Sequence, residues 1–121
     1  DPSEAGYSYA QPPCPHQEII ELYHRILTDL PQIVSWTPAR KAALQARWRE
    51  DRRPQTIAWW EGFFEFVKKS DYLCGRVTPP PGRNRFLADL EWLIVQGNFV
   101  KILEKRYAVN RGQEGPRKVA L

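Results

Sequence analysis

Apolar side chains recur at the three- and four-residue spacing of a helix along most of the chain. The clearest stripe consists of Ile57, Trp60, Phe64 and Val67, and this spacing places all four side chains on one helix face. No stretch alternates apolar and polar residues as a half-buried strand would. We therefore expect an all-α protein, folded as a compact bundle of about five helices.

Local signals mark where the helices start. Thr37 is followed by Pro38, and a threonine cap with proline in the first helical position is typical of a helix N-terminus. Thr56 can cap the next helix in the same way, and Asn98 the last one. Together with the apolar stripes, these signals predict helices at about residues 16–29, 38–50, 57–69, 86–95 and 99–107.

The two ends of the chain differ from the middle. Residues 1–15 contain four prolines, which disfavour a helix and predict a flexible linker. Residues 108–121 have no apolar periodicity and predict a disordered basic tail. The helical domain is expected at residues 16–107. The chain has no methionine, even at position 1, which suggests an excised part of a longer protein.

Charge is distributed unevenly along the chain. Residues 1–30 carry five acidic groups and one basic group, whereas residues 37–53 carry six basic and two acidic groups. Residues 76–85 add three arginines without any acid. Such segregation is what a polyanion-binding face needs. It fits an ordinary solvated surface equally well.

No pattern typical of an enzyme is present. The glycines are isolated, so no phosphate-binding loop is expected, and no Ser-His-Asp arrangement is visible. Asp89 lies in an apolar stretch, where a carboxylate could act as a general acid or base. A structural ion pair with Arg76 or Arg85 is the favoured interpretation. We therefore expect a protein without catalytic activity.

Metal and cofactor binding are not expected either. Cys14 and Cys74 are far apart in the sequence, and only His16 and His24 could complete a zinc site. Cys74 is predicted to be a small buried residue. The few cysteines and the absence of a long apolar run favour the reducing cytoplasm of a bacterial or phage-infected cell.

Two aromatic side chains lie off the main apolar stripes. Trp59 and Phe66 fall beside the stripe of the helix at 57–69, whereas most of the other aromatic residues there are expected in the core. An exposed aromatic ring beside cations can stack on a single-stranded base. Trp59 is therefore a candidate stacking residue.

The basic residues supply candidate phosphate contacts. Arg40, Lys41 and Arg47 are expected on the outer flanks of the helix at 38–50, and the arginines of the 76–85 loop could close over the same ligand. Such contacts are sensitive to salt and blind to base sequence. The candidate DNA-binding residues are Arg40, Lys41, Arg47, Arg52, Arg53, Arg76, Arg83, Arg85 and Trp59.

Several spaced blocks of the sequence together resemble a known module. They are Leu44-Gln-Ala-Arg47-Trp48, Trp59-Trp60-Glu-Gly-Phe63-Phe64-Glu-Phe66-Val67, Ser70-Asp71-Tyr72-Leu73-Cys74-Gly75-Arg76, Phe86-Leu-Ala-Asp89-Leu-Glu-Trp92-Leu and Asn98-Phe99-Val-Lys101-Ile-Leu-Glu104. The pattern is similar to the C-terminal domain of phage and prophage replication proteins, over about residues 16–107. The resemblance implies a role in starting replication, by binding DNA and by bringing in the host's replicative helicase or its loader.

Two functions therefore remain open. In the first, the chain binds DNA, preferably single-stranded, through the basic helix edge and the 76–85 loop. In the second, it is a protein-interaction module that contacts the helicase or its loader through the acidic first helix or through exposed aromatic residues. The two differ in salt dependence, because phosphate contacts weaken steeply as salt rises.

Overall fold

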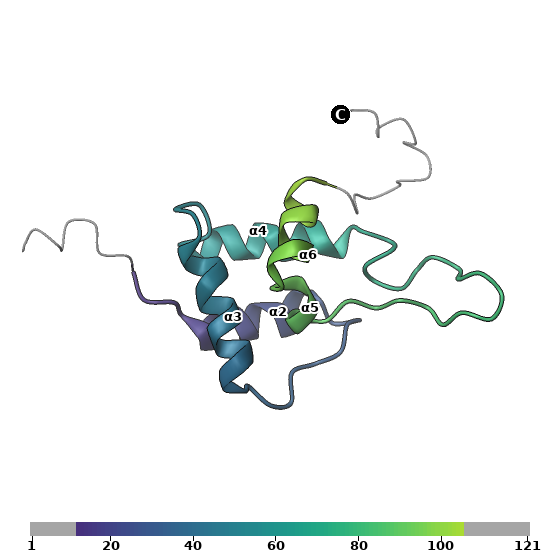
Figure 1. Cartoon of the computed structure of the whole chain (residues 1–121), viewed down its shortest axis with the longest axis horizontal. Coiled ribbons are helices and arrows are strands. Elements are labelled where there is room, and N and C mark those ends of the chain that lie inside the picture. Colours follow the sequence, from purple (N-terminus) through teal and green to yellow (C-terminus); the bar gives the residue numbers. More distant parts are fainter. Residues whose placement is uncertain (1–11, 106–121) are drawn as a thin grey trace, which may run out of the picture.

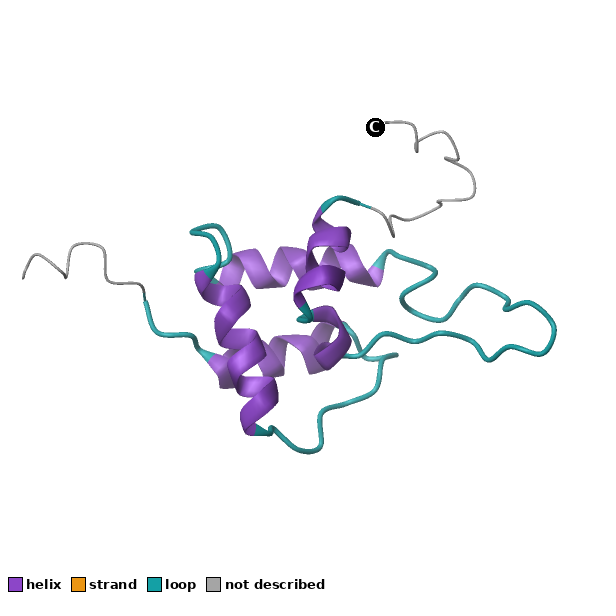
Figure 2. Ribbon diagram, viewed as in Figure 1, coloured by secondary structure: helices purple, strands orange, loops and turns teal. Residues whose placement is uncertain are grey.

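The computed structural model describes residues 12–105, and within them it contains five helices and no strand. The all-α prediction is confirmed (Figure 2). Most of the predicted linker at 1–15 and all of the predicted tail at 108–121 lie outside the described residues. The helices are α2 (His16–Ile26), α3 (Pro38–Arg49), α4 (Ile57–Lys68), α5 (Leu90–Leu93) and α6 (Gln96–Leu103).

The helices form two crossing layers. In Figure 1, α2 and α4 lie side by side, and α3 and α6 cross in front of them. The short helix α5 leads directly into α6. A long connection between α4 and α5 extends away from the helices on the side opposite α3.

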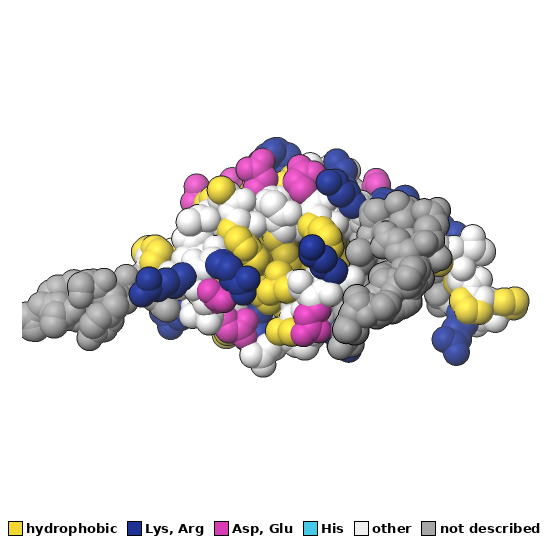
Figure 3. Space-filling model, turned by 90° about the horizontal axis from the view of Figure 1, so that it is seen from above, with side chains coloured by type: hydrophobic (Ala, Val, Ile, Leu, Met, Phe, Trp, Pro, Cys, Tyr) yellow, Lys and Arg dark blue, Asp and Glu magenta, His cyan; other side chains and the backbone are white. Residues whose placement is uncertain are grey.

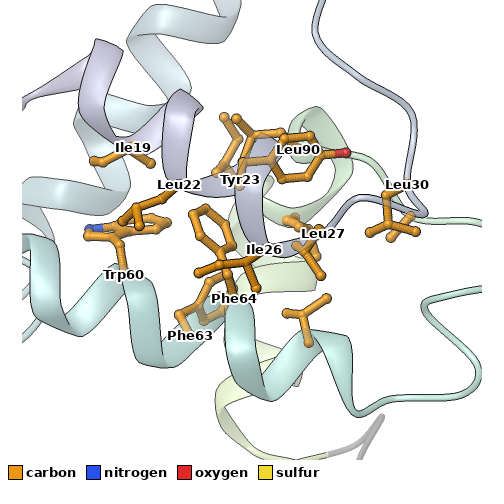
Figure 4. Packing of buried hydrophobic residues seen from close by; sticks show 14 of the residues in the cluster. Ile19, Leu22, Tyr23, Ile26, Leu27, Leu30, Trp60, Phe63, Phe64 and Leu90 are labelled. Atoms are coloured by element: carbon orange, nitrogen blue, oxygen red, sulfur yellow. The ribbon is translucent and has the colours of Figure 1, made fainter.

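The core lies between α2 and α4. Tyr23 of α2 meets Phe64 of α4 edge to face, with ring centroids 5.9 Å apart (Figure 4). Trp60 is fully buried, and its indole N–H donates to the Pro54 carbonyl at 2.7 Å. Such a bond removes the cost of burying the indole nitrogen. Phe99 of α6 belongs to the same aromatic cluster, and its ring centroid lies 5.0 Å from that of Phe63.

Both predicted threonine caps are confirmed. The Thr37 hydroxyl accepts from the Arg40 amide at 3.2 Å, and the Thr56 hydroxyl accepts from the Trp59 amide at 3.1 Å. These bonds satisfy amides that have no partner inside the helix. The starts of α3 and α4 therefore lie where local chemistry predicts them.

Three helix boundaries were predicted wrongly. Helix α2 ends at Ile26, because Leu27 and Leu30 turn into the core ahead of Pro31. Helix α6 begins after Val95 instead of Asn98. It also ends at Leu103, before the predicted residue 107, because Glu104 leaves the helix and Lys105 adopts a φ of 64°.

The helix predicted at 86–95 is mostly absent. Residues 86–88 have no regular secondary structure, and the Ala88 amide donates to the Leu73 carbonyl at 2.9 Å. Asp89 then caps the four-residue helix α5, accepting from the Trp92 amide at 2.8 Å. The expected ion pair of Asp89 with Arg76 or Arg85 is therefore wrong, since the carboxylate is used as a helix cap and Arg76 pairs with Asp71.

Candidate nucleic-acid interface

Arg40 is held between α3 and α5. Its Nε and Nη2 atoms donate to the same Glu91 carboxylate oxygen, at 3.1 and 2.8 Å, and its Nη1 atom donates to the Ser35 carbonyl at 2.9 Å. The guanidinium thus ties two helices together. A phosphate would have to compete with Glu91 for it.

Arg47 is buried, so its predicted place on the outer flank of the helix is wrong. Only 8% of the residue is exposed, and its Nη1 atom lies 3.3 Å from a Glu50 carboxylate oxygen. The helical spacing explains this position, because Arg47 follows Leu44 by three residues and precedes Trp48, and both of these are core residues. This spacing was visible in the sequence, and it places Arg47 toward the core despite the charge of its side chain.

The turn after α3 contains one paired and one unpaired cation. Arg53 donates through Nη2 to Asp51 at 2.8 Å. This hydrogen bond holds the pKa of the Asp51 carboxyl below its usual range. Arg52 is exposed and forms no ion pair with any residue from 12 to 105, and the same is true of Lys41 at the start of α3.

The connection between α4 and α5 forms a protruding arm, which we define as residues 76–88. At its base, Arg76 donates through Nε to Asp71 and through Nη2 to the Lys68 carbonyl, both at 2.8 Å. The hydrogen bond to Asp71 raises the pKa of Arg76. Arg76 therefore fastens the arm to the end of α4.

The arm carries two exposed arginines, Arg83 at its outer turn and Arg85 nearer its base, where the Arg85 stem lies beside Gly75. The Arg83 amide donates to the Pro80 carbonyl at 3.0 Å, and Gly82, with a φ of 82°, occupies the position of this turn that requires a left-handed backbone. Arg83 and Arg85 are exposed, and neither forms an ion pair within residues 12–105. The arm points away from α3 (Figure 1). The structure thus separates the loop arginines from the α3 cations.

Trp59 lies at the edge of the aromatic core. Its ring stacks on that of Phe63, with the centroids 5.3 Å apart and the planes 12° apart. The centroid of Phe99 lies 5.8 Å from that of Trp59. Its remaining surface lines a hollow of about 430 Å³ whose apolar wall also includes Val100 and Leu103 of α6.

The rim of this hollow is more acidic than basic. Glu50, Asp51 and Glu104 line it, against the single cation Arg53. Figure 3 views this side of the molecule and shows an apolar patch bordered by acidic and basic side chains. Glu50 and Asp51 are paired with Arg47 and Arg53, so the residues lining the hollow offer a phosphate no unpaired cation, and the stacking role of Trp59 stays a prediction. The contribution of Val100 and Leu103 was missed, because it depends on α6 lying beside Trp59 and the turn after α3, which are distant in the sequence.

Cys74, His24 and His16 make packing or hydrogen-bond contacts within the fold. Cys74 is buried, as predicted, and burial raises its pKa. The His24 Nε2 atom accepts from the Ile33 amide at 2.9 Å, whereas His16 meets the edge of Trp36. Among the described residues, no group of three or more His, Cys, Asp or Glu side chains could hold a metal ion.

None of the helices between residues 12 and 105 is long and apolar enough to cross a membrane. The candidate residues from the sequence lie at three places: the arm, the α3 region, and the hollow beside Trp59. No protein-family model, curated protein or solved structure matches the chain.

Proposed function

We propose that the chain is a non-enzymatic module that binds single-stranded DNA, and that the arm makes the main contact. The observation that carries this proposal is the pair Arg83 and Arg85, exposed on a protruding loop and not neutralised by any acid from 12 to 105. Cations of this kind bind phosphates by releasing counterions. The resemblance to phage and prophage replication proteins supports a role at the start of replication.

The remaining candidate cations contribute unequally. Arg40, Arg53 and Arg76 each have a carboxylate partner, and Arg47 is buried. A phosphate gains less from a cation that an acid already neutralises. Lys41 and Arg52 are the α3-region residues that can add to the arm, as secondary phosphate contacts.

The test is fluorescence anisotropy of a labelled oligo-dT titrated with the protein at low and moderate salt. Arg83→Ala with Arg85→Ala is expected to weaken binding and to reduce the salt slope by about 1.4, since each contact with a single strand contributes about 0.7. The matched control is Arg25→Ala with Lys101→Ala, which removes the same charge from exposed sites elsewhere. Absence of binding at low salt would refute the proposal.

A second function has an observation of its own. The hollow beside Trp59 has apolar walls formed by Phe99, Val100 and Leu103, and aromatic residues are frequent anchors of protein interfaces. A replicative helicase or its loader is the partner that the resemblance implies. Leu103→Asp should then abolish binding of the purified partner, whereas Val95→Asp, at an exposed site outside the hollow, should not. Equal effects of Leu103→Asp and Val95→Asp on partner binding would contradict this function.

A further inference from the structure

Four basic residues meet where the arm joins the end of α4. We define this basic cluster as Lys68, Lys69, Arg76 and Arg85, all of which are exposed. Lys68 and Lys69 lie at the C-terminal end of α4, and the connection that carries the arm starts directly after them (Figure 1). The two lysines were not among the DNA-binding residues predicted from the sequence.

Contacts of the backbone and of side-chain stems hold the basic cluster together. The Arg76 Nη2 atom donates to the Lys68 carbonyl at 2.8 Å, so this guanidinium lies against the last turn of α4. The preceding residue, Gly75, lies beside the Arg85 stem, because a Cβ atom at Gly75 would be 3.3 Å from the Arg85 Cδ atom. The pair Gly75 and Arg76 therefore brings Arg85 of the arm close to the end of α4.

Cations outnumber acids in this region. Residues 65–88 contain five lysines and arginines and two acids, Glu65 and Asp71. Asp71 is bound by Arg76. The other three members of the basic cluster form no ion pair with any residue from 12 to 105. Their charges are therefore available to a phosphate at the base of the arm.

We propose that Lys68 and Lys69 are phosphate contacts of the DNA interface, so that a single strand bound by the arm continues past Arg85 onto the end of α4. This inference rests on the proposed function and adds two residues to it. Contacts of this kind release counterions and do not depend on the identity of the base. Arg76, whose guanidinium is bound by Asp71 and the Lys68 carbonyl, is a positioning residue that holds the base of the arm against the helix.

The experiment measures the affinity for a labelled oligo-dT by fluorescence anisotropy over a series of salt concentrations. Lys68→Gln with Lys69→Gln keeps part of the aliphatic stems and should reduce the salt slope by about 1.4, since each contact with a single strand contributes about 0.7. The matched control, Arg25→Gln with Lys101→Gln, removes the same charge from exposed sites elsewhere and should leave the slope unchanged. A labelled strand of abasic sites should show the same loss, because the contacts are made to phosphates.

A substitution of opposite sign tests where the strand lies. Glu65 is exposed one helical turn before the two lysines and forms no ion pair within residues 12–105. Glu65→Gln removes its repulsion of a phosphate at the end of α4 and should tighten oligo-dT binding. Glu18→Gln, at the start of α2 and away from the end of α4 (Figure 1), should change binding less, because salt screens distant charges. Equal effects of the two substitutions would contradict a strand at the end of α4.

The outcomes separate this inference from the proposed function. If oligo-dT does not bind at low salt, both fail. If Arg83→Ala with Arg85→Ala reduces the salt slope while the double lysine variant matches its control, this inference is refuted and the arm stands. If only the double lysine variant reduces the slope, the end of α4 binds the strand and the arm does not.

A lysine in the last turn of a helix also interacts favourably with the helix dipole, so thermal melting is used to show that the double lysine variant is folded. Should it unfold, Lys69→Gln alone changes only the residue after the last helical position. The single variant should reduce the salt slope by about 0.7, and an unchanged slope would refute the inference for that residue.

Discussion

Arg47 shows how a side chain's neighbours can outweigh its charge. It lies on the same face of α3 as Leu44 and Trp48, and its Nε atom forms no hydrogen bond with any residue from 12 to 105. A buried ion pair gains Coulomb energy but loses the solvation of both charges. The pair of Arg47 with Glu50 is therefore a packing feature with little net electrostatic benefit.

This leads to a prediction on stability. Arg47→Met fills a similar volume without a buried charge and should leave the free energy of unfolding equal to or above that of the wild type. Arg47→Ala should lower it by roughly 1–3 kcal/mol, because the aliphatic stem is lost. Urea unfolding followed by tryptophan fluorescence measures both. If a folded Arg47→Met variant bound DNA more weakly than the wild type, Arg47 would have to be counted as part of the DNA interface.

The two thiols allow a second prediction. Burial raises the pKa of the Cys14 thiol to about 11 and also raises that of Cys74, whose Sγ atom lies 3.4 Å from the Val67 carbonyl. The thiolate is the reactive form, so little of it exists at pH 8 in the folded protein. Iodoacetamide should label the native chain at least about tenfold more slowly than the chain in urea, where the thiols have ordinary pKa values near 8.5. Equal labelling rates for the native chain and the chain in urea would contradict the burial of the two thiols.

At the scale of elements, the arm depends on one residue that lacks a side chain. Gly75 has a left-handed backbone and leaves space for Leu87 and for the Arg85 stem. An added methyl group meets Leu87 and strains the backbone at the same time. The packing between the two ends of the arm thus requires glycine at this position.

Gly75→Ala should destabilise the protein by about 1–3 kcal/mol. The matched control is Gly62→Ala in the exposed face of α4, where a Cβ atom meets nothing within 4 Å. That substitution should stabilise the protein by about 0.5–1 kcal/mol, because alanine is the better helix former. Thermal unfolding of the two variants tests the argument, and a shift in the same direction for both would contradict it.

At the scale of the whole molecule, charge and apolar surface are separated. On the arm, Arg83 and Arg85 are not neutralised by any acid from 12 to 105. The hollow beside Trp59 instead combines apolar walls with three carboxylates. The chain's net charge of +4 does not reveal this separation. Two ligands of different chemistry could therefore bind one small domain.

The two surfaces should act independently. Leu103→Asp is expected to change oligo-dT affinity by less than about twofold, since sites without shared contacts contribute additively. Arg83→Ala with Arg85→Ala should likewise leave binding of a purified helicase or loader unchanged. Parallel loss of both activities in either variant, with the fold intact by circular dichroism, would show that the surfaces are coupled.

Local interactions explain which parts of the fold were predictable. The caps Thr37 and Thr56 and the apolar stripe of α4 depend on residues at most a few positions apart, and they were predicted correctly. The helix predicted at 86–95 failed because Ala88 pairs with Leu73, fifteen positions earlier in the chain. An apolar run of this length does not distinguish a helix from an irregular segment held by such a contact.

The sequence by itself determined the all-α class, the starts of α3 and α4 and the excess of cations in the loop after α4, because these follow from composition and short-range periodicity. The tertiary structure decided which of the other cations remain available: Arg40 is bound by Glu91, whereas Arg83 and Arg85 are exposed on the arm. It also brought Tyr72 against Phe86. The Arg40–Glu91 ion pair and the Tyr72–Phe86 contact join residues distant in the chain, and local pattern carries no information about which distant residues meet.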